Sequence, residues 1–364
     1  MNKLFTKRFW ALMISFLLIS SISFSQLKVI NGDFLKGGLD DGRILLTSYI
    51  TPFANAFGAG FNGGWYNTAK PHKFGGFDIT ISVNVGLIPS SAKMVDIKTL
   101  GFKTLSLTNP TGTSLTPTIA GGLSNGPELH AMAGSVELAK FNAPAGLNLT
   151  FMPVPIVQAG IGLPLGTEVK IRYLPQINVN NYKLSIWGVG LMHSIMQYIP
   201  GHDLLPFDLS LFGGYSKLAA NVPISVQPGT APDAVVNYTA AYPVPFPKQN
   251  IAPSVEAWNV SLIGSVKLAV ITFYGGLGYS KTKTTVAFKG SYPLPVIDAA
   301  VSTTKPVYED KGVINNITPL SIENFSGLRA NIGFRLKLAI LTIHGDFTRS
   351  QYNVVSAGIG MSFR

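Results

Sequence analysis

The last thirteen residues, Tyr352 to Arg364 (YNVVSAGIGMSFR), alternate between apolar and small polar positions. Side chains two residues apart share one face of a strand, so one face carries Val355, Ala357, Ile359, Met361 and Phe363 and the other Ser356, Gly358, Gly360 and Ser362. The small polar face lacks the bulk to fill a soluble core, and the apolar face ends on an aromatic residue, as a lipid-facing strand does at an interfacial girdle. This stretch therefore predicts the closing strand of a membrane barrel.

The first 25 residues have the form of an export signal. Lys3, Lys7 and Arg8 precede an apolar run from Phe9 to Ile19, and small residues at Ser23 and Ser25 precede Gln26. The apolar run is too short to span a bilayer and ends at a small-residue cleavage pattern, which favours a secretory signal over a membrane anchor. We expect an exported chain that begins near Gln26.

The composition narrows the class of membrane protein. Hydrophobic residues make up 46% of the chain and charged residues only 12%, yet no apolar run after the signal is long enough for a membrane helix. A membrane protein without membrane helices is a barrel. The chain has no cysteine, which excludes disulfides and a cysteine-linked lipid anchor, and its net charge of +11 comes from scattered Lys and Arg, which predicts no nucleic-acid partner.

Ten segments show strand patterns. They are Phe77 to Leu87, Met152 to Leu163, Glu168 to Leu174, Lys183 to Met192, Phe207 to Lys217, Trp258 to Lys267, Ile271 to Thr284, Leu328 to Lys337, Leu341 to Arg349 and the closing strand. An even number suits a bacterial barrel with both termini in the periplasm. The predicted fold is all-β, an antiparallel transmembrane barrel over residues 74–364 with about ten strands, or twelve to fourteen if the long loops hide further hairpins.

The connections alternate between short and long. Residues 162–167, 267–269 and 337–339 form short turns, whereas residues 89–145, 218–256 and 285–325 are long and rich in Pro, Gly, Thr and Asn. In outer-membrane barrels the long loops face outside the cell and the short turns face the periplasm. The connection from His193 to Pro206 begins as a short helix on the periplasmic side.

Residues 26–73 are not strand-like and form a separate N-terminal segment. Asp40 to Gly60 predicts an amphipathic helix, whose apolar stripe would need cover: Ile44, Leu45, Tyr49, Ile50, Phe53 and Phe57. We expect this helix to plug the lumen or to cap the periplasmic end of the barrel. Trp65, Tyr66, Lys70 and Lys73 are then expected at the barrel mouth, where they form either a ligand-gripping loop or an interfacial belt with basic anchors.

Strand parity turns seven charged or titratable side chains toward the lumen, and these are the candidate ligand contacts. They are Lys170, Arg172, Arg329, Arg335, Lys337, His344 and Asp346. Charge pairs across neighbouring strands would tie the lumen shut. Alternatively, the cations form a constriction that prefers anions or the carboxylate head of an amphiphile.

Motifs for catalysis and metal binding are missing from the sequence. It contains no nucleophile elbow, phosphate loop or zinc-binding helix pair, and its five histidines are dispersed. We therefore expect no enzyme activity, no cofactor and no metal.

Three stretches carry a family resemblance: GGWYNTAKPHKFGGFDITISVNVGLIP, GLPLGTEVKIRYLPQI and GVGLMHSIMQYIPGHDLLPFDLSLFGGYSKL. They resemble an uncharacterised family of Bacteroidetes-type outer-membrane barrel proteins. More distantly, the N-terminal segment is similar to that of the fatty-acid transporter barrels, where such a segment plugs the lumen. The chain departs from those barrels in having fewer strands and Asn67-Thr68-Ala69 in place of their asparagine-proline-alanine motif.

These observations leave two functions open. The first is a passive channel or transporter for small hydrophobic or amphiphilic compounds. The second is a non-conducting barrel that displays its long loops to partners. In both cases we expect a bacterial outer-membrane protein whose partners are membrane lipid, lipopolysaccharide and the barrel-assembly machinery, with a small hydrophobic ligand in the first case.

Overall fold

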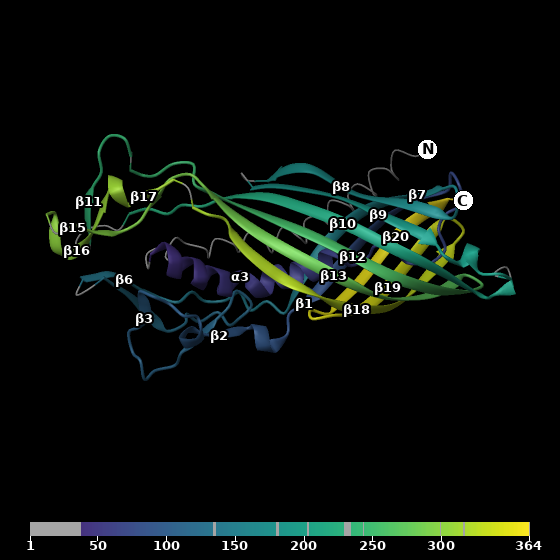
Figure 1. The fold of residues 1–364 in the computed structure, drawn as a ribbon, viewed down its shortest axis with the longest axis horizontal. Helices are drawn as coiled ribbons and strands as arrows, with labels where there is room; N and C mark the ends of the chain where they lie inside the picture. Colours follow the sequence, from purple (N-terminus) through teal and green to yellow (C-terminus); the bar gives the residue numbers. More distant parts are fainter. Residues whose placement is uncertain are drawn as a thin grey trace, which may run out of the picture.

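The computed structural model describes residues 38–363, apart from 134–135, 180–181, 202–203, 229–233, 243, 299 and 316. The expected signal at residues 1–25 lies outside the described residues. The molecule is elongated, with a barrel at one end and loops and small sheets at the other (Figure 1). Among the described residues, no helix combines the length and the apolar character needed to cross a bilayer.

A closed antiparallel barrel of ten strands confirms the predicted fold. Its strands are β1 (Phe77–Leu87), β7 (Phe151–Leu163), β8 (Thr167–Val179), β9 (Tyr182–Ser194), β10 (Phe207–Pro223), β12 (Asn250–Leu268), β13 (Ile271–Lys289), β18 (Leu320–Leu338), β19 (Leu341–Arg349) and β20 (Val354–Phe363). Each strand pairs with its neighbours in chain order, and β20 closes the barrel by placing Phe363 opposite Phe77. All ten predicted strands are present.

The two ends of the barrel differ as the connection lengths predict. The tight turns between β7 and β8, β12 and β13, and β18 and β19 lie at the same end as Phe77 and Phe363, which we call the turn end. The long connections, residues 88–150, 224–249 and 290–319, lie at the opposite end, the loop end. In the β9–β10 connection the predicted short helix is a 3₁₀ turn, Met196–Tyr198.

The wall alternates between outward apolar and inward polar side chains. Ile79, Val260, Leu262, Phe334 and Ile359 are exposed on the outside of the wall, and the outward Ile81 is half-buried. Aromatic pairs mark two levels of this outer surface. Trp187 packs on Tyr215 and Trp258 packs on Tyr279 toward the loop end, and Phe77 stacks on Phe363 at the turn end. An apolar band between aromatic belts is the surface of a membrane barrel.

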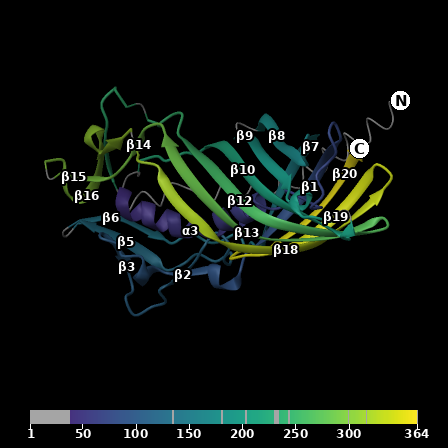
Figure 2. The same ribbon diagram turned by 45° about the vertical axis from the view of Figure 1, so that its right-hand side comes forward.

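The helix α3 (Leu39–Phe61) matches the predicted helix, and its position shows where the described part of the N-terminal segment lies. Its first half packs among the loops of the loop end, and its second half enters the barrel (Figures 1 and 2). Of the two predicted positions, the lumen is correct, and the cap at the turn end, which the connection lengths assign to the periplasm, is not. Asp41 fixes the entrance, because its carboxylate accepts hydrogen bonds from the backbone amides of Lys103, Thr104 and Leu105.

Two glycines, Gly60 in α3 and Gly86 in β1, allow close packing of the helix against the barrel wall. A Cβ on Gly60 would lie 2.9 Å from Val154 Cγ2, and one on Gly86 of β1 would lie 2.0 Å from the carbonyl oxygen of Ala56. The helix continues past Gly60 to Phe61. Backbone can therefore approach backbone where the helix meets the barrel wall.

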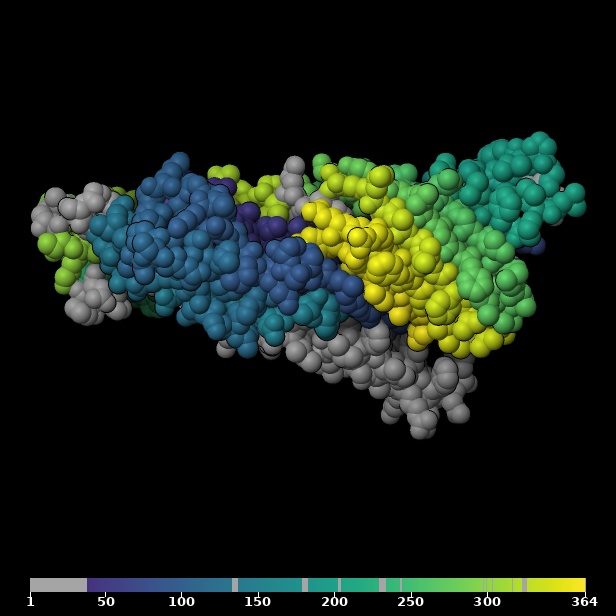
Figure 3. Space-filling model, turned by 90° about the horizontal axis from the view of Figure 1, so that it is seen from below, coloured from purple at the N-terminus to yellow at the C-terminus, as the bar shows by residue number. Residues whose placement is uncertain are grey.

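The long connections build a small domain at the loop end. Its short strands form sheets separate from the barrel, so they add no barrel strands: β2 (Met94–Asp96), β3 (Leu105–Leu107), β4 (Leu115–Pro117), β5 (Glu128–Ala133), β6 (Val136–Asn142), β11 (Val235–Asn237), β14 (Tyr292–Pro293), β15 (Val296–Asp298), β16 (Ser302–Glu309) and β17 (Val313–Ile314). Leu45 and Tyr49 of α3 share an apolar core with Leu129 and Tyr292. On one face, the connection after β1 leaves only small patches of α3 at the surface (Figure 3).

Candidate functional site

The barrel lumen is the candidate site, and it is filled. We call α3 together with residues 62–73 the plug. Inward polar side chains of the wall are buried behind it, as in Asp78, Thr80, Ser82, Gln158, Glu168, Lys170, Arg172, Arg329, Asn331, Arg335, Thr342, His344 and Asp346. Water would reach these groups in an open pore. Their burial means that the plug occludes the lumen.

Two predicted lumen cations bind the end of α3. Arg172 donates from Nη1 to the carbonyl oxygen of Phe61 (2.8 Å) and from Nη2 to that of Gly63 (2.6 Å). Arg329 donates from Nη1 to the carbonyl oxygen of Asn62 (2.8 Å). Partial negative charge collects at a helix C-terminus, so both guanidinium groups stabilise it. Both arginines therefore hold the plug in the lumen, and Arg172 Nε also donates to Gln158 Oε1 of the neighbouring strand β7 (3.0 Å).

Trp65 and Tyr66 lie deep in the lumen, whereas the sequence predicted them at the mouth. The Trp65 ring packs on Phe212 of β10 and under the guanidinium of Arg172, 3.6 Å from the ring centroid. The hydroxyl of Tyr66 donates to Asn331 Oδ1 (2.7 Å). Gly190 makes room for this layer, since a Cβ there would lie 2.9 Å from Trp65 Cζ3. The two rings thus belong to the seal.

Lys70 and Lys73 lie at the turn-end mouth, as predicted. Lys70 is half-exposed and forms an ion pair with Asp208 (3.5 Å), and Lys73 is exposed. Between them and the aromatic layer, the hydroxyl of Ser210 donates to the carbonyl oxygen of Ala69 (2.5 Å). The plug is therefore held to the wall from the end of α3 to the turn-end mouth.

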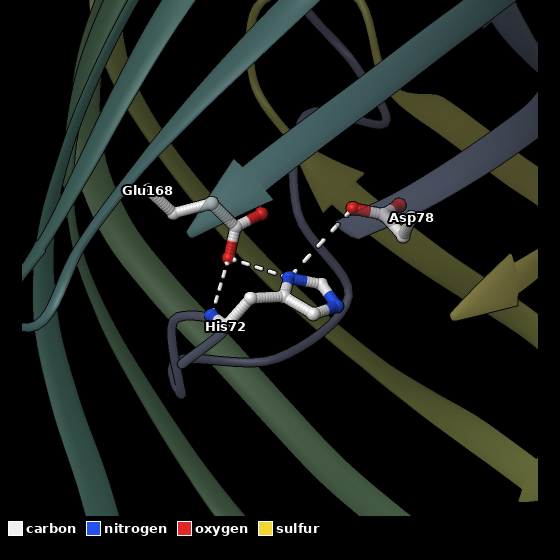
Figure 4. Close-up of side chains that lie close together, drawn as sticks. All are labelled: His72, Asp78 and Glu168. Carbon is white, nitrogen blue, oxygen red and sulfur yellow. Dashed lines mark hydrogen bonds and ion pairs between the residues drawn. The ribbon is translucent and has the colours of Figure 1, made fainter. Parts of the chain in front are cut away.

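A buried cluster joins the plug to two strands near the turn end (Figure 4). The backbone N–H of His72 donates to Glu168 Oε2 (2.9 Å). The imidazole Nδ1 lies 3.0 Å from the same oxygen and 3.8 Å from Asp78 Oδ1. Lys170, one of the predicted lumen residues, pairs with the other oxygen of Glu168. Sequence reasoning did not single out this trio, because the three residues come from separate segments.

The other predicted lumen residues also face inward. Arg335 and His344 are buried and directly opposite each other on β18 and β19. Lys337 donates to Ser362 Oγ (3.0 Å), and Asp346 accepts a hydrogen bond from the hydroxyl of Tyr274 (3.1 Å). Every one of the seven therefore points into the lumen.

The loop-end half of the lumen has an apolar inner surface. Met152, Val154 and Ile156 of β7 are buried against Phe57 and Phe61 of α3. Ile186, Leu218, Val255 and Val354 from other strands belong to the same cluster. The lumen therefore changes from polar at the turn end to apolar at the loop end.

The barrel wall is unpaired beside this apolar surface. β7 and β8 pair only from Leu163–Thr167 to Gln158–Arg172, although β7 continues to pair with β1 and β8 with β9 toward the loop end. We call the unpaired segments, residues 151–157 and 173–179, the seam. Pro153, Pro155 and Pro175 lie in these segments and lack the N–H that a ladder needs. Sequence analysis missed the seam, and these prolines were the available signal.

The chain is similar in structure to several solved outer-membrane proteins, at low sequence identity. The attachment invasion locus protein Ail of Yersinia pestis shows 7% identity and a TM-score of 0.25, covering 80% of this chain and 98% of Ail. The translocator domain of the autotransporter NalP from Neisseria meningitidis shows 12% identity and a TM-score of 0.30, covering 80% and 89%. A Pseudomonas aeruginosa FadL homologue shows 9% identity and a TM-score of 0.23, covering 85% and 96%.

Sequence comparison identifies the family. No curated protein sequence matches the chain. A family profile matches nearly its whole length, residues 1–363, and that profile describes a Family of unknown function (DUF6588). The chain belongs to this family.

Proposed function

We propose that this protein is an outer-membrane barrel that passes small hydrophobic or amphiphilic molecules sideways, from the apolar inner surface of its loop-end half through the seam into the membrane. The unpaired seam beside Met152, Val154 and Ile156 carries this proposal. The outward apolar band, its aromatic belts and the predicted export signal support the membrane location.

The plug argues against a water-filled axial pore. Arg172, Arg329 and the Trp65–Tyr66 layer fill the polar half of the lumen with bonded groups. A hydrated solute would have to displace all of them to pass along the barrel axis. A route that avoids the turn-end half avoids this cost.

The chemistry of the loop-end half favours an apolar cargo. Val157 and Tyr173, the first residues beyond the last β7–β8 pair, face outward and are exposed. Inside the same stretch of β7, the side chains are Met152, Val154 and Ile156. None of these side chains is charged. An apolar molecule that moves between the two surfaces therefore forces no charged group to give up its water.

The bonded plug also supports a second function, a closed scaffold that displays its loop-end domain to partners. Such a scaffold needs no exchange between its lumen and the membrane. The two functions therefore differ in whether closing the seam has any effect.

The test is to close the seam reversibly. The chain has no cysteine, so Val157→Cys with Tyr173→Cys provides two unique thiols for a reducible bis-maleimide. The matched control is Val260→Cys with Tyr279→Cys, an outward pair on the intact β12–β13 ladder. Cells expressing each variant are given 1-N-phenylnaphthylamine, which fluoresces when it enters membrane.

The proposal expects faster dye entry with the wild-type protein than without it. Cross-linking the seam should reduce entry to the level of cells that lack the protein, and reduction of the linker should restore it. Cross-linking the control pair should change nothing. Dye entry that is independent of the protein, or unaffected by the seam cross-link, would support the scaffold instead.

A further inference from the structure

His72, Asp78 and Glu168 meet at one point from three separate parts of the fold. His72 belongs to the plug, Asp78 to the first turn-end residues of β1 and Glu168 to the start of β8. One nitrogen or oxygen atom from each lies within 4.8 Å of the other two, and all three side chains are buried (Figure 4). No other group of this kind occurs among the described residues.

The hydrogen bonds around the cluster leave one position unfilled. Asp78 Oδ2 accepts from the hydroxyl of Thr80 (2.9 Å), but the buried Oδ1 has no hydrogen-bond partner. A proton on His72 Nδ1 would serve Glu168 at 3.0 Å and leave Asp78 Oδ1 unserved at 3.8 Å. A cation placed between the three atoms would contact both carboxylates, which a proton on the imidazole does not.

The surroundings orient these groups as ligands. His72 Nε2 lies 3.1 Å from Ser362 Oγ, so its N–H can donate to the hydroxyl and leave the Nδ1 lone pair directed at the cluster. A hydrogen bond on the far nitrogen is the usual support of a metal-bound imidazole. Gly160 keeps the space open, because a Cβ there would lie 2.4 Å from Asp78 Oδ1 and 2.7 Å from Glu168 Oε1.

The ligand types select a class of cation. Imidazole with two carboxylates suits Zn²⁺ and similar transition metals, whereas Ca²⁺ and Mg²⁺ require mostly oxygen ligands. Zn²⁺ holds such ligands at about 2.0 Å, which places two ligand atoms about 3.3 Å apart. The observed separations from His72 Nδ1, 3.0 and 3.8 Å, lie on either side of that value.

We propose that His72, Asp78 and Glu168 bind one Zn²⁺-like divalent cation, which fastens the turn-end part of the plug to β1 and β8. Lys170 remains paired with Glu168 Oε1, and Oε2, which also accepts the backbone N–H of His72, is the oxygen that faces the metal. The site is independent of transport through the seam, because the seam lies in the other half of the barrel.

The test measures Zn²⁺ binding to the purified full-length protein in detergent, in competition with a chromophoric chelator. One Zn²⁺ per chain is expected. His72→Gln and Asp78→Asn should each weaken binding about 100-fold, and Ser362→Ala should weaken it about tenfold by freeing the imidazole. His193→Ala is the matched control, since His193 lies at the same end but contacts Thr167 and Gln197.

A second measurement separates a metal site from an ion-pair cluster. Zn²⁺ should slow hydrogen exchange of the backbone amides of residues 66–73 in the wild-type protein and not in Asp78→Asn. Heat-modifiable migration in gels confirms that each variant forms a barrel. Wild-type protein that binds no Zn²⁺, or binds it as tightly as His72→Gln does, would overturn the proposal.

Discussion

Arg172 of β8 donates a hydrogen bond to the carbonyl oxygen of Phe61, the last residue of α3, across 2.8 Å. A cation on the barrel wall thereby caps a helix that enters from the loop end. The same guanidinium covers the Trp65 ring, so one side chain holds both the helix end and the aromatic layer. Arg172 is the point at which loss of one side chain should open the lumen.

We predict that Arg172→Ala loosens the plug without disrupting the strand pairing of the barrel wall. Each lost hydrogen bond to this charged group costs about 1.5–3 kcal/mol, and the freed carbonyls remain buried. Planar-bilayer recordings should show ion conductance that the wild-type protein lacks. Lys267→Ala removes an exposed cation and should leave the bilayer silent. A silent Arg172→Ala protein would mean that the aromatic layer alone seals the lumen.

Gly86→Ala should displace α3 from β1. The added methyl group would lie 2.0 Å from the carbonyl oxygen of Ala56, so the helix has to move. We expect faster protease cleavage within α3 and a loss of stability of about 1–3 kcal/mol, the usual range for overpacking. Gly213→Ala, also in a barrel strand, meets no atom within 4 Å and serves as the control. Equal cleavage of the two variants would contradict the observed contact.

The barrel was predictable from sequence because lipid and lumen impose opposite demands on alternate residues. In β1, Ile79, Ile81 and Val83 alternate with Thr80 and Ser82, which is the alternation of a membrane-barrel strand between a lipid-facing and a lumen-facing side. The helix was predictable from the spacing of Leu45, Tyr49 and Phe57 in the same way.

The contents of the lumen were not predictable, because they depend on contacts between distant segments. Arg172 could be placed on the inner face by counting, but only the fold brings Phe61 and Gly63 to it. The trio of His72, Asp78 and Glu168 shows no motif spacing for the same reason. The sequence predicted Trp65 at the mouth because the segment around it mixes aromatic and basic residues, as an interfacial belt does. In the structure, the chain passes through the whole lumen before β1 begins, so Trp65 lies inside.

We predict that low pH weakens the contact of Asp41 with residues 103–105 at the loop end. Burial alone would raise the pKa of Asp41, but hydrogen bonds from the amides of Lys103, Leu105 and Thr104 outweigh it and lower that pKa. A lowered folded-state pKa stabilises the protein fully above the ordinary Asp pKa of about 3.9, and this stabilisation is lost as the pH falls through the folded value.

Hydrogen exchange of residues 103–105, corrected for intrinsic rates, should therefore accelerate as the pH falls below about 3.9. Asp41→Asn should cost about 2 kcal/mol near neutral pH and remove this dependence. Asp40→Asn, which removes only an exposed ion pair with Lys103, should retain it. The same pH response in both variants would exclude Asp41 as its source.

Phe363→Ala should impair closure of the barrel. The Phe363 ring stacks on Phe77 with centroids 4.7 Å apart, where the first and last strands meet. Loss of the aromatic pair removes about 0.5–1.5 kcal/mol beyond the lost apolar burial. The measurement is the fraction of protein that shows heat-modifiable migration after membrane assembly. Met361→Ala, on the same outward face, should assemble better than Phe363→Ala, and equal assembly would remove the special role of the terminal aromatic residue.

The most direct test of lateral access is photolabelling of the protein in liposomes with a small hydrophobic diazirine, followed by mass spectrometry. If the seam joins the membrane to the apolar inner surface, label should appear on inward Met152 and Ile156 as well as on outward Val260 and Phe334. Cross-linking Val157→Cys to Tyr173→Cys should remove the inward label and keep the outward label. Label confined to outward residues in the uncross-linked protein would contradict lateral access.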